Sequence, residues 1–318
     1  MATETMAPLH TDGRFQNPWG TNNSKTFWSV LKWKFSTTPE KWPEQVHFDP
    51  QELPATPKTG ALITWVNHAT WLIQLPTMNI LVDPVWSKRA SPFSFAGPKR
   101  VHEPGIPWDK LPKIDLVLVS HNHYDHLDIA TLEALEKRDH PQFLVPLGDL
   151  DLLKSKGISR IAELTWWQEF KMGTTVVTFT PAQHWSARWT WDRNKSLWGG
   201  WWIQEGQTSL FHAGDTGHGP HFKVIREKLG TPTMAMIPIG AYEPRWFMKA
   251  MHMNPADAVE SVKDLGLPKL SVAMHFGTFQ LTDEGHDQPM IDLKKAIESA
   301  KLESQFKVPK VGETFVSD

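Results

Sequence analysis

Candidate metal ligands are concentrated in residues 120–126, which read Ser-His-Asn-His-Tyr-Asp-His. The four groups able to ligate a metal there are His121, His123, Asp125 and His126. Imidazoles and carboxylates suit Zn²⁺ or a similar first-row metal. The segment directly follows the apolar run 115–119, and a turn at the end of a strand can direct all four side chains toward one point. We therefore predict a metal centre here rather than a polar surface loop.

Three further candidate ligands each follow a predicted strand directly. They are His184 after 174–180, Asp215 after 208–213 and His275 after 270–274. Each is weak evidence alone, because a single His is more often a core or surface residue and Gly-Asp-Thr-Gly can be only a turn. Together with the first segment they supply five His and two Asp, enough for two metals that share a bridging carboxylate.

The elements that must position these ligands are mostly strands. Strands are predicted at 61–66, 70–75, 79–82, 115–120, 143–146, 174–180, 197–204, 208–212, 234–238 and 270–274. Helices are predicted at 27–35, 126–137, 149–156, 255–265 and 290–303. This order favours an α/β fold with sheets packed face to face and helices outside.

The first 58 residues differ from the rest of the chain. Residues 1–24 are polar and are expected to be extended, and residues 36–58 contain five prolines and are expected to wrap over a surface. Because no linker-like composition follows residue 61, we expect an N-terminal extension over 1–58 and one catalytic domain over 59–318.

The composition restricts the chemistry further. The chain has 318 residues, 17 Trp and no Cys, which excludes disulfides, thiolate ligands and Cys nucleophiles. The net charge of −2, without a basic stripe, disfavours a nucleic-acid substrate. Residues 60–82 carry no formal charge, but Asn67 and His68 interrupt them, so they are interpreted as strands rather than a membrane span. The N-terminus lacks the pattern of a signal peptide, and a cytoplasmic location is expected.

The order His-x-His-x-Asp-His, followed by His, Asp and His, resembles the signature of the metallo-β-lactamase fold superfamily. The resemblance implies an αββα four-layer sandwich with a dinuclear zinc site at one edge of its two sheets; other first-row divalent metals stay open. It implies that His121, His123 and His184 hold one metal, that Asp125, His126 and His275 hold the other, and that Asp215 bridges them. A hydroxide between the metals would be the nucleophile.

More segments resemble the family of N-acylphosphatidylethanolamine-hydrolysing phospholipases D. They are residues 12–15, 17–19, 89–92, 97–100, 120–128, 145–148, 166–167, 183–185, 197–199 and 237–248. The resemblance covers the chain from about Gly13 onward. It implies a zinc-dependent phosphodiesterase that releases an N-acylethanolamine and phosphatidic acid, and it suggests a homodimer. The alternative is a hydrolase of the same fold acting on another phosphodiester, a lactone or an ester. A metal-stabilised, non-catalytic lipid-binding protein is disfavoured, because a structural site needs only four ligands.

Several polar residues are candidates for contact with the substrate. His252 matches a family His that follows Arg-Trp-Phe-Met. It is proposed, together with Asp125, as a catalytic residue, acting as a general acid or as a contact to the phosphate. The alternative is that His252 only packs next to the start of a helix. His68 is either a residue that supports the metals or a turn cap. Tyr242 is placed at the pocket, and Arg245 is assigned either to substrate binding or to an ion pair with Glu243. The other histidines near Asp215, namely His212, His218 and His221, are treated as non-ligands.

The tryptophans suggest a lipid substrate. Eight of the 17 lie between residues 166 and 202, around the ligand His184. Trp198, Trp201 and Trp202 are expected in the core, whereas Trp185 and Trp189 are assigned to substrate binding and Trp189 and Trp191 to a membrane interface. Residues 21–42 carry a local charge of +3 among aromatic residues. They favour peripheral binding to a membrane, with intramolecular packing as the alternative.

Overall fold

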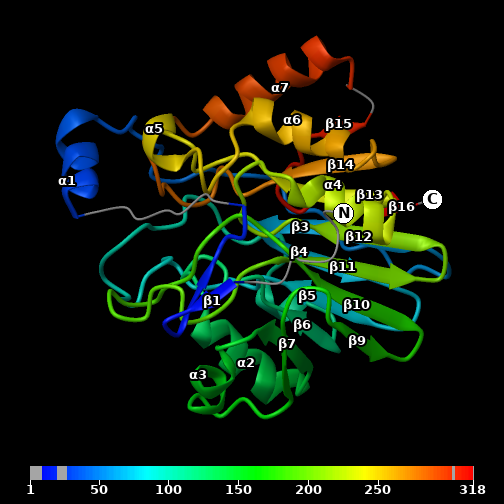
Figure 1. The fold of residues 1–318 in the computed structure, drawn as a ribbon. Coiled ribbons are helices and arrows are strands. Elements are labelled where there is room, and N and C mark those ends of the chain that lie inside the picture. Colours follow the sequence, from blue (N-terminus) through cyan, green and yellow to red (C-terminus); the bar gives the residue numbers. More distant parts are fainter. Residues whose placement is uncertain (1–8, 20–26, 303–304, 318) are drawn as a thin grey trace.

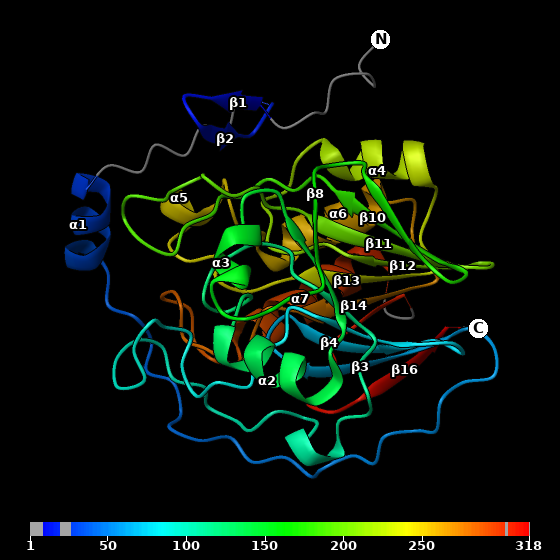
Figure 2. The same cartoon turned by 90° about the horizontal axis from the view of Figure 1, so that it is seen from below.

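The computed structural model describes residues 9–19, 27–302 and 305–317. Within this part of the chain, two seven-stranded sheets pack face to face with helices on both outer sides, and Figure 1 shows α6 and α7 on one side and α2 and α3 on the other. The same layering is visible in the second view, where α4 and α2 lie on opposite sides of the sheets (Figure 2). The predicted αββα sandwich is confirmed.

The first sheet has the order β16-β3-β4-β5-β6-β7-β8. Its strands are β16 (Thr314–Ser317), β3 (Ala61–Asn67), β4 (Thr70–Gln74), β5 (Asn79–Val82), β6 (Leu116–Leu118), β7 (Gln142–Pro146) and β8 (Ile161–Leu164). The meander β16-β3-β4-β5 is antiparallel, and β5 to β8 run parallel. Parallel strands leave the sheet at the same edge, so the loops after β5 and β6 come together there.

The second sheet has the order β15-β14-β13-β12-β11-β10-β9. Its strands are β9 (Glu169–Met172), β10 (Thr175–Thr180), β11 (Gly200–Glu205), β12 (Thr208–His212), β13 (Met234–Pro238), β14 (Leu270–Met274) and β15 (Phe306–Lys307). β12 to β15 are parallel, and β9 to β12 are antiparallel. Strands β10, β12 and β14 therefore run in one direction, and the residues that follow them lie at the same edge of the sheet.

The core is divided into layers, because successive side chains along a strand point to opposite faces of the sheet. In β3, Ile63 and Trp65 join the cluster between the sheets, whereas Val66 joins the cluster under α2 and α3. Three of the tryptophans, Trp71, Trp198 and Trp201, are at most 1% exposed. The expected core position of Trp198 and Trp201 is confirmed, and Trp202 is also buried.

Helices α2 (Ile129–Asp139) and α3 (Leu150–Lys154) cover the first sheet, and α4 (His221–Leu229), α6 (Pro255–Asp264) and α7 (Gln288–Ala300) cover the second. Helix α6 starts with a capping box in which Asn254 and Asp257 bond to each other's main chain, as an Asn-Pro start favours. Short elements complete the described chain: the hairpin β1 (Leu9–Thr11) and β2 (Arg14–Gln16), α1 (Phe27–Ser36), the 3-10 turn η1 (Trp108–Lys110) and α5 (Arg245–Met248).

Several predicted elements differ from the structure. Helix α2 begins at Ile129 rather than at residue 126, because residues 121–127 form the turn that carries the ligands and Asp128 precedes the helix. Strand β11 begins at Gly200 rather than at 197, and α7 spans Gln288–Ala300 rather than 290–303. Residues 9–16, expected only to be extended, pair as a hairpin. Elements β8, β9, β15, β16, α4 and α5 were not predicted.

The segment between α1 and β3 runs around the outside of the molecule (Figure 2). It contacts the rest of the chain through main-chain bonds such as Val46 N–H to the carbonyl of Val101, 2.6 Å. Part of the basic and aromatic stretch 21–42 lies outside the described residues, namely 21–26. No helix among the described residues is long and apolar enough to cross a bilayer.

Candidate metal centre

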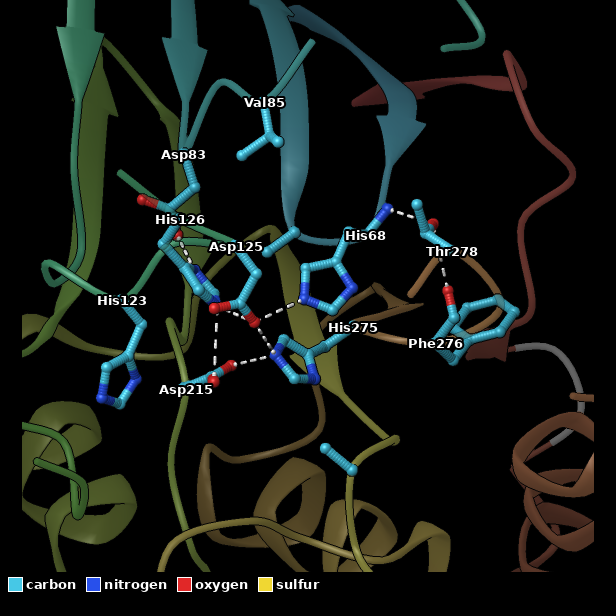
Figure 3. A network of polar contacts seen from close by, with 12 residues as sticks. His68, Asp83, Val85, His123, Asp125, His126, Asp215, His275, Phe276 and Thr278 are labelled. Atoms are coloured by element: carbon cyan, nitrogen blue, oxygen red, sulfur yellow. Dashed lines mark hydrogen bonds and ion pairs between the residues drawn. The ribbon is translucent and has the colours of Figure 1, made fainter. Parts of the chain in front are cut away.

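The predicted ligands meet at one edge of the sandwich. Residues 121–126 follow β6, and His184, Asp215 and His275 lie in the loops after β10, β12 and β14. Figure 3 shows Asp125, His126, Asp215 and His275 pointing toward one another, with His123 to one side. The parallel course of these strands explains the convergence.

Three imidazoles form the first group. The distance from His121 Nε2 to His123 Nδ1 is 2.8 Å, and from His123 Nδ1 to His184 Nε2 it is 3.2 Å. Ligand nitrogens on one tetrahedral Zn²⁺ with bonds of about 2.0–2.1 Å would be about 3.3 Å apart. The three side chains are thus spaced like ligands of one ion, and their nitrogens face one another.

The second group contains Asp125, His126 and His275, with His68 beside them. Asp125 Oδ2 lies 3.5 Å from His126 Nε2, 3.4 Å from His275 Nε2 and 3.0 Å from His68 Nε2. Residue His68 is 1% exposed and has a φ of 43°, and its main-chain N–H donates to Thr278. Its ring nitrogen therefore contacts a predicted ligand, which favours the supporting role over the turn cap, the other alternative for this residue.

Asp215 lies between the two groups. Its Oδ2 is 3.7 Å from His184 Nε2 and 3.3 Å from His126 Nε2, and its Oδ1 is 2.9 Å from His275 Nε2. One carboxylate therefore faces ligands of both groups, which is the position that a bridge would need.

The residues present fit a pair of divalent cations. Within the described residues, Asp125 and Asp215 have only histidines as ion-pair partners, although both are buried. The buried Nε2 atoms of His126 and His275 make no hydrogen bond to the described residues. Buried carboxylates that face imidazole nitrogens without forming hydrogen bonds are costly unless a cation lies between them, so this donor set is suited to metal.

The electrostatics of the two groups differ. In the first group, burial lowers the pKa of His184 to about 3 and of His123 to about 4, and burial with neighbouring imidazoles lowers the pKa of His121 well below its ordinary value. These rings are neutral and have lone pairs available. In the second group burial also opposes charge, but the carboxylates outweigh it and raise the pKa of His275 to about 9. The carboxylates of the second group therefore favour a positive charge beside them.

Other residues orient the ligands and had not been singled out. Asp83, fully buried after β5, accepts from His126 Nδ1–H at 2.7 Å and from the hydroxyl of Ser120 at 2.6 Å (Figure 3). The carbonyl of Met251 accepts from His184 Nδ1–H at 3.0 Å. Each bond leaves Nε2 as the lone-pair nitrogen that faces the centre. Asp83 directly follows a predicted strand, as several of the predicted ligands do, and that position was the signal from which its place at the metal centre could have been predicted.

A cleft of about 930 Å³ opens over the centre. His252 lines it, with Nδ1 3.9 Å from Asp215 Oδ2, and so do Trp185 and Trp189. The lining is mainly apolar and also includes the cations Arg188 and Arg193. Further residues at the cleft are Val30, Trp33, Ala241, Phe247, Met248, Met251, Leu281 and Thr282. The cleft thus joins the ligands His123, Asp125 and Asp215 to an apolar wall.

Two predicted substrate residues have other partners. Tyr242 is 3% exposed and donates its hydroxyl to Asp292 at 2.9 Å, while its neighbour Ala241 lines the cleft. Arg245 pairs with Asp257, not with Glu243, and its guanidinium also donates to the carbonyl of His252 at 3.0 Å. The alternative ion pair with Glu243 is therefore wrong, because the side chain turns toward the start of α6.

The residues treated as non-ligands have partners outside the centre. His212 contacts the carbonyl of Ala69 at 3.0 Å, and His221 contacts the hydroxyl of Thr216 at 3.0 Å. His218 faces Asp264 at 3.0 Å.

Comparisons with known proteins agree with this architecture. Residues 78–276 match the family model described as "Beta-lactamase superfamily domain". The chain is 41% identical over 255 residues to N-acyl-phosphatidylethanolamine-hydrolyzing phospholipase D 1 of Caenorhabditis elegans, covering 76% of this chain and 71% of that protein. It is 34% identical over 258 residues to a mitochondrial protein of the same activity name from Saccharomyces cerevisiae, covering 79% of this chain and 55% of the relative.

Solved structures share the fold. A possible metal-dependent hydrolase from Veillonella parvula matches with a TM-score of 0.67 at 18% identity, covering 81% of this chain and all of that one. Igni18, a metallo hydrolase from the archaeon Ignicoccus hospitalis, matches with a TM-score of 0.62 at 24% identity, covering 82% of this chain and 99% of that one.

Proposed function

The chain belongs to the beta-lactamase superfamily and, within it, to the family of N-acyl-phosphatidylethanolamine-hydrolysing phospholipases D, and we propose that it hydrolyses the phosphodiester of an N-acylated phosphatidylethanolamine. It is a metal-dependent hydrolase of the metallo-β-lactamase fold. The products would be an N-acylethanolamine and phosphatidic acid. Water adds to phosphorus, the bond from phosphorus to the ethanolamine oxygen breaks, and that oxygen takes a proton.

One observation carries the proposal: the ligand cluster forms the floor of a wide, mainly apolar cleft with two arginines in its wall. A phosphodiester has one negative charge between apolar chains, so its binding needs cations next to apolar surface. The volume of about 930 Å³ is at the upper end of small-molecule sites, which span about 300–1,000 Å³.

We assign one cation to His121, His123 and His184 and a second to Asp125, His126 and His275, with Asp215 shared. Paired cations, when bound, lower the pKa of water toward about 7 and neutralise charge that develops on phosphoryl oxygens. Zn²⁺ is the proposed ion because imidazole and carboxylate are its usual ligands where thiolate is absent.

His252 is proposed as the proton donor to the leaving oxygen or as a contact to the phosphate. It lines the cleft beside Asp215, and its ring stands 5.0 Å from that of His184. Two bonds hold the surrounding segment, namely Arg245 to the carbonyl of His252 and His184 to the carbonyl of Met251. The ring is thus placed next to the site at which a phosphodiester would react.

The function is tested by product identification with a mixed N-acylated phospholipid, with and without chelator. We expect phosphatidic acid and N-acylethanolamine, and loss of turnover on chelation with the fold retained. Turnover confined to soluble esters or lactones would refute the proposed substrate and favour the alternative hydrolase.

The role of His252 is tested separately. His252→Ala is expected to lower kcat/KM about 100-fold or more, within the range for a general acid, while the protein keeps both metals. His218→Ala is the matched control, because His218 faces Asp264 rather than the cleft. A His252→Ala enzyme that stays within a few-fold of the parent would remove this residue from the mechanism.

Contact with a membrane surface is the remaining part of the proposal. Trp28, Phe35, Trp189, Trp191 and Trp246 are 76%, 85%, 45%, 63% and 53% exposed. Val30 of α1 and Trp189 also line the cleft, so α1 and the loop after β10 border it. Helices α1 and α5 are adjacent and distant from β16 in both views (Figures 1 and 2).

Liposome co-sedimentation tests this contact. The double variant Trp28→Ser, Phe35→Ser is expected to bind lipid vesicles more weakly while hydrolysing detergent-dispersed substrate normally. Val316→Ser is the control, because Val316 is 57% exposed but lies on β16, away from α1. Equal binding of the double variant and the control would contradict the proposed membrane face.

A further inference from the structure

The N-terminal strap, residues 9–19, packs against the loop that carries His184. The main-chain N–H of Phe15 donates to the carbonyl of Asn194 at 2.8 Å, and the side chain of Asn194 donates back to the carbonyl of Phe15 at 3.1 Å. Phe15 is 5% exposed. The strap lies outside residues 78–276, the part that matches the family model, yet it is fixed to the loop after β10.

One strap residue bonds directly to a predicted ligand residue. Asn17, 6% exposed, donates from Nδ2 to the carbonyl of His184 at 3.0 Å. Its Oδ1 accepts from the indole N–H of Trp198 at 3.2 Å, which fixes the orientation of the amide. An amide is suited to this place because it donates on one side and accepts on the other.

The bond from Asn17 completes the restraint on His184. The ring already donates Nδ1–H to the carbonyl of Met251 at 3.0 Å, which sets the direction of Nε2. The asparagine holds the main-chain carbonyl of the same residue. With both ends held, the imidazole keeps Nε2 at 3.2 Å from His123 Nδ1 and 3.7 Å from Asp215 Oδ2.

A second strap residue reinforces the same loop. Trp19 donates its indole N–H to Gln183 Oε1 at 2.6 Å, and Gln183 donates to the carbonyl of Ala250 at 2.8 Å. The Trp19 ring stacks on His221, with centroids 5.3 Å apart and planes 14° apart. Gln183 thus joins the strap to the residues that precede His252.

We propose that Asn17 is a positioning residue of the metal centre, which orients His184 through its main-chain carbonyl, and that the strap is a part of the site rather than a separate extension. The inference rests on the proposed function only in taking His184 as a ligand. Residues that orient ligands typically contribute about 10–100-fold to metal affinity or activity.

The test measures metal binding and therefore does not depend on the lipid substrate. Asn17→Ala and the near-isosteric Asn17→Asp are titrated with Zn²⁺ against a chromophoric chelator and with Co²⁺, whose visible absorption reports ligand geometry. We expect affinity for one of two ions to fall about tenfold or more, with an altered Co²⁺ spectrum and with the melting of the chelated protein close to that of the parent. Asn17→Asp keeps an acceptor for Trp198 and replaces the donor to the carbonyl of His184 with a charged oxygen that cannot donate, whereas Asn17→Ala removes the donor without adding charge.

Gln16→Ala, one residue away in β2, is the matched control and should bind both ions as the parent does. Parental affinity and spectrum in folded Asn17→Asp would overturn the inference. Equal losses in Gln16→Ala and Asn17→Asp would also overturn it, because they would indicate general loosening of the strap. If the variants bind metal as expected but the parent protein does not hydrolyse the lipid, the proposed substrate is refuted. The positioning role of Asn17 is then unaffected.

Discussion

Asp149 should make the stability of this protein depend on pH. It is 1% exposed, and its Oδ1 accepts from Asn122 Nδ2 at 3.0 Å and from the hydroxyl of Ser196 at 2.7 Å. Its Oδ2 has no hydrogen-bond partner among the described residues. Burial raises the pKa of Asp149 from 3.8 to about 7, although both hydrogen bonds oppose the shift. The folded protein therefore holds this proton more tightly than the unfolded chain does.

The direction and size of the effect follow from that difference. A carboxyl whose pKa is raised by folding stabilises the fold below the unfolded pKa, and this contribution is lost as pH rises through the folded pKa. The free energy of unfolding should fall by about 1.4 kcal/mol per pH unit in that window. The loss is about 4 kcal/mol in total, of which about 3 kcal/mol falls between about pH 5 and about pH 8.

The assay compares urea unfolding of the parent and Asp149→Asn across this pH range, with chelator present so that metal binding does not contribute. The amide keeps an oxygen acceptor for Asn122 and Ser196 but cannot ionise. We expect the stability difference to grow in favour of the variant by about 3 kcal/mol from about pH 5 to about pH 8. Asp151→Asn, an exposed change in the helix that follows Asp149, is the control. Parallel pH curves for parent and Asp149→Asn would refute the reasoning.

Three further outcomes are expected. Asp83→Ala removes the acceptor of His126 Nδ1–H and should weaken binding of one of two Zn²⁺ ions about 10–100-fold in chelator competition; unchanged affinity would exclude the orienting role. Arg245→Lys cannot hold Asp257 and the carbonyl of His252 together, and kcat should fall about tenfold in steady-state assays while metal content stays constant. Trp71→Ala empties a fully buried position and should cost about 3–5 kcal/mol in urea unfolding; a loss under about 1 kcal/mol would contradict the packing.

The strands and the ligand positions were predictable because both depend on local pattern. Buried strands appear as short apolar runs, and β3, β4, β5 and β14 lie where such runs predict them. Elements with weaker patterns were missed. The residues of β9 alternate between exposed and half-buried, and those of β8 are mostly half-buried, so apolar periodicity gives little signal for either strand.

The residues that orient the ligands could not be found from local pattern. Asn17 and His184 are 167 positions apart in the chain, and their bond exists only because the strap returns to the loop after β10. Asp83 follows a predicted strand and precedes a proline, so it reads as a turn residue, and its position alone does not identify His126 as its partner. The alternative that paired Arg245 with Glu243 relied on their closeness in sequence, whereas its charge partner Asp257 comes from the start of α6. Folding creates each of these pairs.

The loop after His184 contains both buried and exposed tryptophans. Trp198 at its end is 1% exposed and donates to Asn17, whereas Trp189 and Trp191 stack on each other, 5.3 Å between centroids, and are substantially exposed. Asp192 holds the turn between them by accepting from the main-chain N–H groups of Arg188 and Trp189. One loop therefore presents apolar rings at the mouth of the cleft and is tied at its base to a ligand. The exposed rings and His184 therefore belong to one continuous loop, and a force on the rings would reach the predicted metal ligand through that loop.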